Sequence, residues 1–340
     1  MPNTVVQVYS SLEAEYSALR RGAVVIDRSE RVRLRLAGPK AAEMMAGLVT
    51  NDTQSLQAGQ GQYAAALTPK GKIVADVRLF VTEGSVLSDT GARAGDAWRA
   101  MVRKYVNPRV APYTDETSST RTLGVYGPTA HHVVEAMAGI NSSALAVLPA
   151  YSHISVDVDA SPWLVARTPD AGTGGFELFL PAAAFDAAWE RATRAGAVPC
   201  GLLAWEAARV EAGRPEWGLD MDETTLVQEA NLDELQAVSY TKGCYVGQEV
   251  VARVHFKGHV NRNLRGLRAT GSMAPQFAST LHDASGKAVG DVRTCVVSPR
   301  LGAIALGMVR REVEPGAVLT ARWDGGEATL EVAPLPFPAP

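Results

Sequence analysis

One cysteine has neighbours that could expose it and activate it. Cys244 follows Gly243, has Lys242 two residues before it, and is followed by the polar pair Gln248-Glu249. Glycines allow turn conformations that expose a thiol, whereas a helix or central strand would bury it. A nearby lysine can favour the thiolate, which is the nucleophilic form. Free cysteine is also among the most buried residue types, so a small apolar residue in a packed turn is the alternative.

The segment around this cysteine resembles a family signature. Residues 242–249 match Lys-Gly-Cys-Tyr-x-Gly-Gln-Glu, the signature of the YgfZ-like folate-binding proteins. Those proteins assist iron-sulfur cluster assembly and belong to the aminomethyltransferase, or glycine cleavage T-protein, superfamily. The resemblance implies an α+β fold in which ferredoxin-like α+β modules surround a central folate channel, followed by a C-terminal β-barrel. It also implies tetrahydrofolate, or a derivative, as the cofactor.

A second region of resemblance lies in the first quarter of the chain. Thr50-Asn51-Asp52, the run from Gly59 to Tyr63, and a glycine turn into a strand at 73–81 are similar to T-proteins. In T-proteins that strand carries paired aspartates, one of them beside the reactive nitrogen of tetrahydrofolate, whereas this chain has Ala75-Asp76. The resemblance implies Asp76 as an acid and folate contact, and Tyr63 as a folate contact. A second carboxylate commonly raises the pKa of such an acid, so Ala75 counts against aminomethyl transfer. A plain edge-strand carboxylate is the alternative for Asp76.

Further folate contacts are implied in the middle of the chain. Residues 172–177 resemble a shortened Thr-Gly-x-x-Gly-Phe-Glu turn whose glutamate, here Glu177, binds the pterin ring. Two carboxylate oxygens can accept the adjacent amino and ring N–H groups of a pterin. Trp205 stands where YgfZ-like proteins place a folate-binding tryptophan, and an indole can stack on an aromatic ligand. The run that begins at Arg209, Arg-Val-Glu-Ala-Gly-x-Pro, is also similar to the superfamily, and the resemblance implies Arg209 as a folate contact. YgfZ-like proteins have a second folate-binding tryptophan near the first strand, and here Arg31 stands in its place. An outward strand residue and a packed tryptophan are the alternatives for Glu177 and Trp205.

Composition restricts the function classes. A chain of 340 residues with net charge −3 and 46% hydrophobic residues is typical of a globular protein of two or three modules. We expect a cytoplasmic location and no membrane segment, because apolar runs are short and the first residues do not resemble a signal peptide. Three widely spaced cysteines argue against a disulfide framework and a metal site. The basic strip at 250–268 could meet an anion, but direct nucleic-acid binding is unlikely in an acidic chain with few aromatic residues there.

Periodicity divides the chain into three parts. Three strand-to-helix units, at 31–48, 123–140 and 176–194, predict stacked α+β modules, and residues 201–212 predict a short helix. Alternation predicts a strand at 250–267, and turn glycines after it predict a small barrel over about 260–333. We therefore expect a folate-binding body at 1–245 of two interleaved modules, a barrel at 246–333 and a proline-rich tail at 334–340.

Three functions are compared. The first is a tetrahydrofolate-binding protein that supports iron-sulfur cluster assembly or repair, and through it tRNA modification, by way of an exposed Cys244. The second is a tetrahydrofolate-dependent aminomethyltransferase, and the third is a thiol enzyme unrelated to folate. The intact signature and Trp205 favour the first, an accessory factor more than an enzyme. Iron-sulfur apoproteins or assembly factors would then be its partners.

Overall fold

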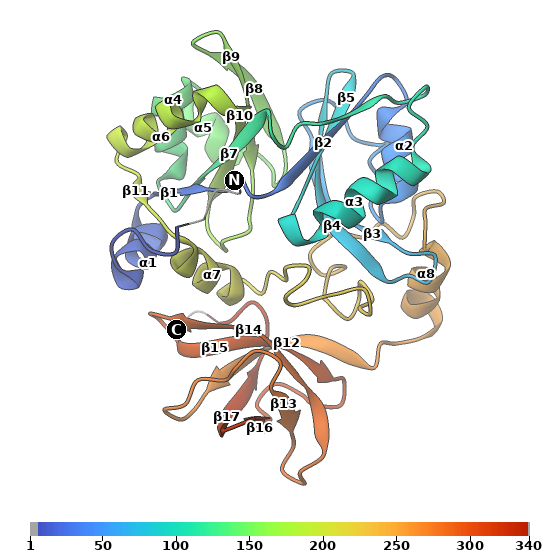
Figure 1. Ribbon diagram of the computed structural model, residues 1–340, viewed down its shortest axis with the longest axis vertical. Coiled ribbons are helices and arrows are strands. Elements are labelled where there is room, and N and C mark those ends of the chain that lie inside the picture. The colour runs from blue at the N-terminus through green and yellow to red at the C-terminus, as the bar shows by residue number, and fades with distance from the viewer. Residues whose placement is uncertain (1–5, 339–340) are drawn as a thin grey trace.

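Two helix-covered sheets stand side by side above a β-barrel in the computed structural model, which describes residues 6–338 (Figure 1). The α+β class with a C-terminal barrel, expected from the sequence, is confirmed. The chain starts in one sheet, builds the other, and then returns to the first. Its first crossover, residues 28–31, therefore runs between the sheets.

The five-stranded sheet has the order β3-β4-β5-β2-β6. Its strands are β2 (Val32–Ala37), β3 (Gly61–Leu67), β4 (Ile73–Thr82), β5 (Ser85–Thr90) and β6 (Tyr113–Asp115). Helices α2 (Ala41–Leu48) and α3 (Ala92–Tyr105) cover one face. That face is apolar because alternate residues of β4, among them Ala75 and Val77, pack against Trp98 of α3.

The six-stranded sheet has the order β11-β1-β7-β10-β9-β8. Its strands are β1 (Val24–Asp27), β7 (Thr120–Tyr126), β8 (His153–Val158), β9 (Ser161–Arg167), β10 (Gly175–Pro181) and β11 (Val198–Pro199). Helices α4 (Ala130–Ala138), α5 (Ser142–Val147) and α6 (Phe185–Arg194, after a 3₁₀ turn at Ala182–Ala184) share a core with one face. Helices α1 (Leu12–Arg21) and α7 (Leu202–Glu211) pack on the other.

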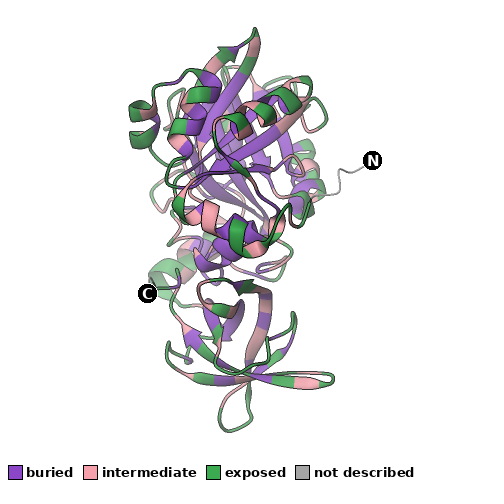
Figure 2. Cartoon of the chain, turned by 90° about the vertical axis from the view of Figure 1, so that its left-hand side faces the viewer, coloured by how far each residue is buried: buried purple, intermediate pink, exposed green. Residues whose placement is uncertain are grey.

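The two sheets also pack against each other, through the uncovered face of the five-stranded sheet and the face of the six-stranded sheet that carries α1 and α7. Phe80 of β4 and Phe179 of β10 meet with ring centroids 5.2 Å apart, in a core that also includes Tyr63 and Leu164. Each sheet is therefore buried on both sides, as the continuous buried colouring of the upper body shows (Figure 2). Charged side chains on these inner faces have little access to water and must find partners within the protein.

The barrel closes in the order β12-β15-β14-β13-β16-β17. Its strands are β12 (Arg262–Ala269), β13 (Thr280–His282), β14 (Ala288–Ser298), β15 (Gly302–Arg310), β16 (Val318–Trp323) and β17 (Gly326–Ala333). Val210 of α7 packs against Leu306 and Met308, which joins the body to the barrel. Phe337 covers the same cluster, and its N–H donates to Glu211 O at 2.9 Å.

The strand expected at 250–267 is wrong over its first part. Residues Gln248–Lys257 form helix α8, and β12 begins only at Arg262. Val250 lies against the Gly71 turn and Val251 enters the inter-sheet core, so these apolar positions contact the body as a helical stripe and not as alternate residues of a strand. A short apolar run fits both periods, and here the helix is formed.

Candidate functional site

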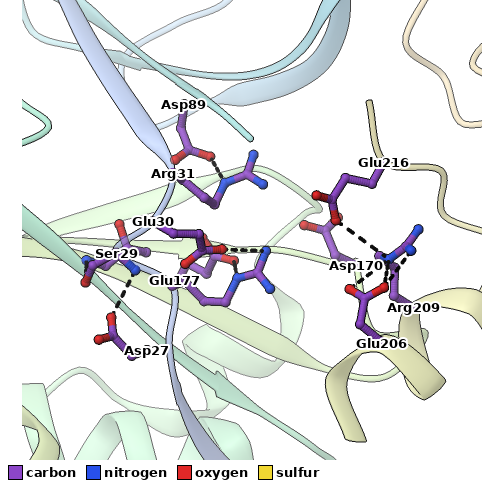
Figure 3. Close-up of polar contacts among 12 residues, drawn as sticks. Asp27, Ser29, Glu30, Arg31, Asp89, Asp170, Glu177, Glu206, Arg209 and Glu216 are labelled. Carbon is purple, nitrogen blue, oxygen red and sulfur yellow. Dashed lines mark hydrogen bonds and ion pairs between the residues drawn. The ribbon is translucent and has the colours of Figure 1, made fainter. Parts of the chain in front are cut away.

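A small charged cavity lies where the two sheets meet α7. Its free space is about 40 Å³, enough for a few water molecules. The lining brings together distant segments: Arg28 and Arg31 from the crossover, Tyr63, Asp76 and Arg78 from β3 and β4, and Trp205 and Arg209 from α7. Figure 3 shows Arg31 reaching Asp89 on one side and Arg209 held by Glu206 and Glu216 on the other. Four of the residues expected to contact folate thus line one cavity, namely Tyr63, Asp76, Trp205 and Arg209.

Asp76 is the carboxyl group best placed for proton transfer. It is buried at the cavity, and Tyr63 Oη donates to its Oδ2 at 3.0 Å. Burial raises the pKa of Asp76 above its usual value, while the charge of Arg31 and the Tyr63 hydrogen bond oppose the shift. A carboxyl group with a raised pKa holds its proton at higher pH than an exposed aspartate does, as an acid catalyst must.

Ala75 has a different meaning from the one expected. Its side chain lies in the apolar core under α2 and α3, with Val77 and Leu79, while Asp76 and Arg78 line the cavity on the other face of β4. Successive strand residues point to opposite faces. A carboxylate at position 75 would therefore point into an apolar core and away from the cavity. The missing second acid is no argument against chemistry at Asp76.

Glu177 of β10 is fully buried, but it does not line the cavity. Tyr126 Oη donates to its Oε1 at 2.5 Å, and Arg78 Nη2 donates to its Oε2 at 2.5 Å. Burial opposes the ionisation of Glu177, but the charge and hydrogen bond of Arg78 outweigh it and lower the pKa. The carboxylate is ionised and occupied by a guanidinium group. Glu177 is therefore a buried acceptor, and not the outward strand residue considered as the alternative.

Trp205 is buried to 1% exposure and packs between two groups. Its ring lies 4.5 Å from the Tyr126 centroid, and the Arg28 guanidinium carbon lies 4.5 Å above the ring. Its buried Nε1 has no hydrogen-bond partner among the described residues. A buried donor without an acceptor is costly, so the indole N–H is a group that a ligand oxygen could satisfy.

Arg209 was expected to contact the cofactor, but its donors are all taken by protein groups. Nε and Nη2 donate to Glu206, Nη1 donates to Asp220 at 2.7 Å and to Arg214 O, and Nη2 also reaches Thr294 Oγ1 at 3.2 Å. Because Thr294 belongs to β14, this side chain ties α7 to the barrel. Its role in the structure is that of a clamp at the edge of the cavity.

The cysteine segment lies outside the cavity lining. Cys244 is exposed, as predicted, and Lys242 Nζ donates to three backbone carbonyls, of Ala46, Val49 (2.8 Å) and Asn51 (2.9 Å). A lysine ammonium has three donors, so this set is complete. Lys242 therefore fastens the segment to the end of α2, and its ammonium is directed at these carbonyls and not at the thiol.

A tetrahydrofolate fits the donor and acceptor groups of this site. Tyr63 and Asp76 offer a hydroxyl and a protonatable carboxyl, the indole N–H of Trp205 lacks an acceptor, and Glu177 Oε2 already accepts an N–H of Arg78, from Nη2. A carboxylate that accepts an N–H of a guanidinium group can also accept an N–H from the amino and ring N–H edge of a pterin, because both are planar nitrogen donors. The chemistry of the set is right, although the free space is smaller than the ligand.

Sequence reasoning missed the arginine network. Arg78 and Asp89 are 2% and 0% exposed at the side chain, and with Arg31 they connect β4, β5 and the crossover. The signal was present in Asp76-Val77-Arg78, two charged residues on one face of an otherwise apolar strand. Within residues 6–338, we find no helix that could cross a membrane and no group of three or more His, Cys, Asp or Glu side chains arranged for a metal ion.

Comparison with known proteins identifies the relatives. The GCVT N-terminal domain family matches residues 2–241. Curated relatives include an aminomethyltransferase of Thermosynechococcus vestitus, 32% identical over 97% of this chain and 88% of the relative, and one of Rubrobacter xylanophilus, 30% identical over 97% and 87%. The crystal structure of aminomethyltransferase T of the Bartonella henselae glycine cleavage system covers 98% of this chain and 91% of that one, with a TM-score of 0.87 at 24% identity. The T-protein-like fold is thereby confirmed.

These relatives correct the function expected from the signature. Iron-sulfur cluster assembly, the apoprotein partners and the tRNA effect are not supported, because the curated relatives are named aminomethyltransferases. The assignment to the YgfZ-like branch rested on the signature at 242–249, whose Cys244 lies outside the cavity lining, and on Trp205, which lines the cavity but is covered by Arg28. Tetrahydrofolate as the expected cofactor agrees with the relatives. By its family match and by these relatives, the chain belongs to the aminomethyltransferase, or glycine cleavage T-protein, family.

Proposed function

We propose that the protein transfers a one-carbon unit from an aminomethylated lipoyl carrier to tetrahydrofolate. The observation that carries the proposal is Asp76, a buried carboxyl group with a raised pKa, oriented by Tyr63 within the inter-sheet cavity. From the sequence alone, Ala75 in place of a second aspartate counts against this function. Because position 75 faces the apolar core and not the cavity, that objection no longer holds.

The reaction needs proton transfer but no oxidant. The methylene carbon of the carrier exchanges its bonds to sulfur and to the amine nitrogen for bonds to two folate nitrogens. Ammonia and the free carrier thiol leave, and the oxidation level of the carbon is unchanged. Tetrahydrofolate supplies the two accepting nitrogens. The protein must therefore hold the reactants, provide a proton to the leaving amine and exclude water.

The residues of the cavity divide these tasks. Asp76 holds the proton at Oδ1 or Oδ2, and Tyr63 fixes the carboxyl group through Oδ2. Glu177 supplies acceptor oxygens for a planar N–H edge, and Tyr126 fixes that carboxylate at Oε1. The flanking sheets bury the site on both sides, and the low local dielectric strengthens each of these interactions.

The test is release of ammonia by purified protein given aminomethylated carrier protein and tetrahydrofolate. We expect turnover by the wild type, and a fall of about 10²- to 10⁴-fold in Asp76→Asn, the range typical of lost acid catalysis. Asp96→Asn is the matched control, because the Asp96 side chain is fully exposed on α3. Absence of turnover in the wild type, or full turnover in Asp76→Asn, would refute the proposal.

A further inference from the structure

Arg78 stands between the cavity and Glu177. It follows Asp76 by two residues on the same face of β4, and its side chain is 2% exposed. Its Nε donates to Asp89 at 2.8 Å and its Nη1 to Asp170 at 2.9 Å, while its Nη2 donates to Glu177 at 2.5 Å and also to Asp89. Arg78 lines the cavity, whereas Glu177 does not. The carboxylate suited to a pterin is therefore covered by a side chain of the protein itself.

The covering group has the same donor chemistry as the expected ligand. A guanidinium group is planar and carries N–H donors that carboxylates accept, and here one of them, on Nη2, occupies Glu177 Oε2. The amino group and ring N–H of a pterin present a similar edge. Glu177 has only two oxygens, and Tyr126 already uses Oε1. Arg78 and a pterin therefore compete for the same acceptor and cannot both use it fully.

We propose that Arg78 is an internal stand-in for the pterin ring, which folate must displace to reach Glu177. This inference rests on the proposed function. It explains why the cavity is only about 40 Å³ while its donor and acceptor groups suit a larger ligand. Arg78 thus sets the affinity for folate, and it keeps the buried carboxylates paired when folate is absent.

The surroundings allow the displacement without leaving a carboxylate unpaired. When Arg78 leaves, Asp89 keeps the Nε donor of Arg31 at 2.6 Å, and Glu177 keeps Tyr126 and gains the ligand. Asp170 already holds Nη1, and its side chain is 21% exposed, so it marks the side of the network that faces water. The guanidinium group can turn toward Asp170 while its other two partners are satisfied by other groups.

The first experiment is a titration of tetrahydrofolate into the full-length protein. Arg78→Met removes the competing guanidinium group. We expect the dissociation constant for tetrahydrofolate to fall by about tenfold or more, because Glu177 is then open to the ligand and Arg78 no longer has to be displaced. Arg78→Lys keeps the charge beside Asp89 but cannot form the planar fork, so it should tighten binding by a smaller factor. Arg33→Met is the control: Arg33 is equally buried, but its partners are backbone carbonyls and threonine hydroxyls.

The outcomes separate the two proposals. Tighter binding in both Arg78 variants, with Arg33→Met unchanged, supports the stand-in. If the wild type binds folate and a folded Arg78→Lys binds it equally or more weakly, the stand-in is refuted and the proposed function is untouched. If neither the wild type nor any variant binds, both proposals fail.

A second experiment uses thermal stability and needs no turnover. Arg78→Ala should lower the melting temperature, and a simple pterin or millimolar methylguanidinium should raise it again by filling the vacated place at Glu177. Arg33→Ala should gain nothing from the pterin. If the pterin raises the melting temperature of wild type and Arg78→Ala equally, or of neither, Arg78 does not occupy the pterin position.

Discussion

The inter-sheet cavity and the cysteine segment at 242–249 are opposites in how their polar groups are satisfied. In the cavity lining, Trp205 Nε1 is buried without a partner in the described part of the chain. Behind Arg31 and Arg78, which also line the cavity, Asp89 Oδ1 has no partner within residues 6–338 while three donors share Asp89 Oδ2. In the segment, the ammonium of Lys242 has a full set of carbonyl acceptors. Buried polar groups without hydrogen-bond partners indicate a place where a ligand can bind. A motif whose hydrogen bonds are all made within the protein indicates a structural role.

Two glycines show what the segment is built for. Gly247 has a φ of +85°, and a Cβ there would lie 2.6 Å from Thr68 O; Gly71 has a φ of +73°, and a Cβ there would lie 2.8 Å from Val250 Cβ. The β3–β4 turn and the start of α8 can approach this closely only without side chains at these points. The glycine spacing of the motif is thus accounted for by packing against the turn that leads into β4.

The largest effect on stability is expected at the clamp beside the cavity. Arg209→Met leaves Asp220 buried without its cation and breaks the link to Thr294. Loss of one partner of a buried ion pair costs about 3–5 kcal/mol, so the free energy of unfolding in urea should fall by that amount. Arg93→Met is the control, since Arg93 is a half-exposed partner of Glu216. Equal stability of the two variants would show that the buried charges are already compensated elsewhere.

Next in size is the glycine of the cysteine segment. Gly247→Ala should lower the free energy of unfolding by about 1–3 kcal/mol, because alanine is strained at positive φ and meets Thr68 O. Gly243→Ala is the control, as nothing lies within 4 Å of a Cβ built there. Folate affinity of the folded protein should not change in either variant. A loss of affinity in Gly243→Ala would give the segment a part in binding.

A smaller and pH-dependent effect is expected at Tyr63. The Tyr63 hydrogen bond favours the ionised form of Asp76, so Tyr63→Phe should raise the pKa of Asp76 further. Activity that needs protonated Asp76 declines as pH rises through that pKa, and the decline should therefore move to higher pH in the variant. The rate at lower pH should fall by about two- to tenfold, as for one lost hydrogen bond. If the pH–rate profile of Tyr63→Phe is unshifted, as that of the Tyr105→Phe control should be, the Tyr63 hydrogen bond does not influence the protonation of Asp76.

The smallest effect is expected at the cysteine itself. Cys244→Ala should leave stability, folate affinity and ammonia release within about twofold of wild type, because the thiol is exposed and outside the cavity lining. Iodoacetamide should modify Cys244 and spare Cys200, whose burial raises its pKa to about 12. Loss of turnover after modification of Cys244 would show that the cysteine segment takes part in the reaction and would contradict the structural role given to it here.

Sequence reasoning succeeded where short-range patterns decide the outcome. The strand-to-helix units around Gly38-Pro39 and Gly127-Pro128 and the turn at Gly71 all form as predicted, because local periodicity and turn residues determine them. It failed at α8, where one apolar run fits two periods. Strand alternation alone could have placed Ala75 opposite Asp76.

Long-range contacts account for the rest. Glu177 and Arg78 are 99 residues apart, and no local pattern reveals that one covers the other. Likewise, Arg28 over Trp205 depends on how the crossover passes α7. The expected function was also drawn from the contiguous motif at 242–249. That motif is easy to recognise in the sequence, but it lies outside the cavity lining.

The docked carboxyl-terminal end has a practical consequence. Phe337 fills the seam between α7 and the barrel, and Arg300 Nη1 donates to Pro338 O at 2.8 Å. Bulk added directly after Pro338 would therefore begin at that seam. Labels for crystallisation or fluorescence are therefore better engineered in the turn between β16 and β17, for instance at the exposed Asp324 and not at Gly325, whose φ of +92° disfavours a side chain.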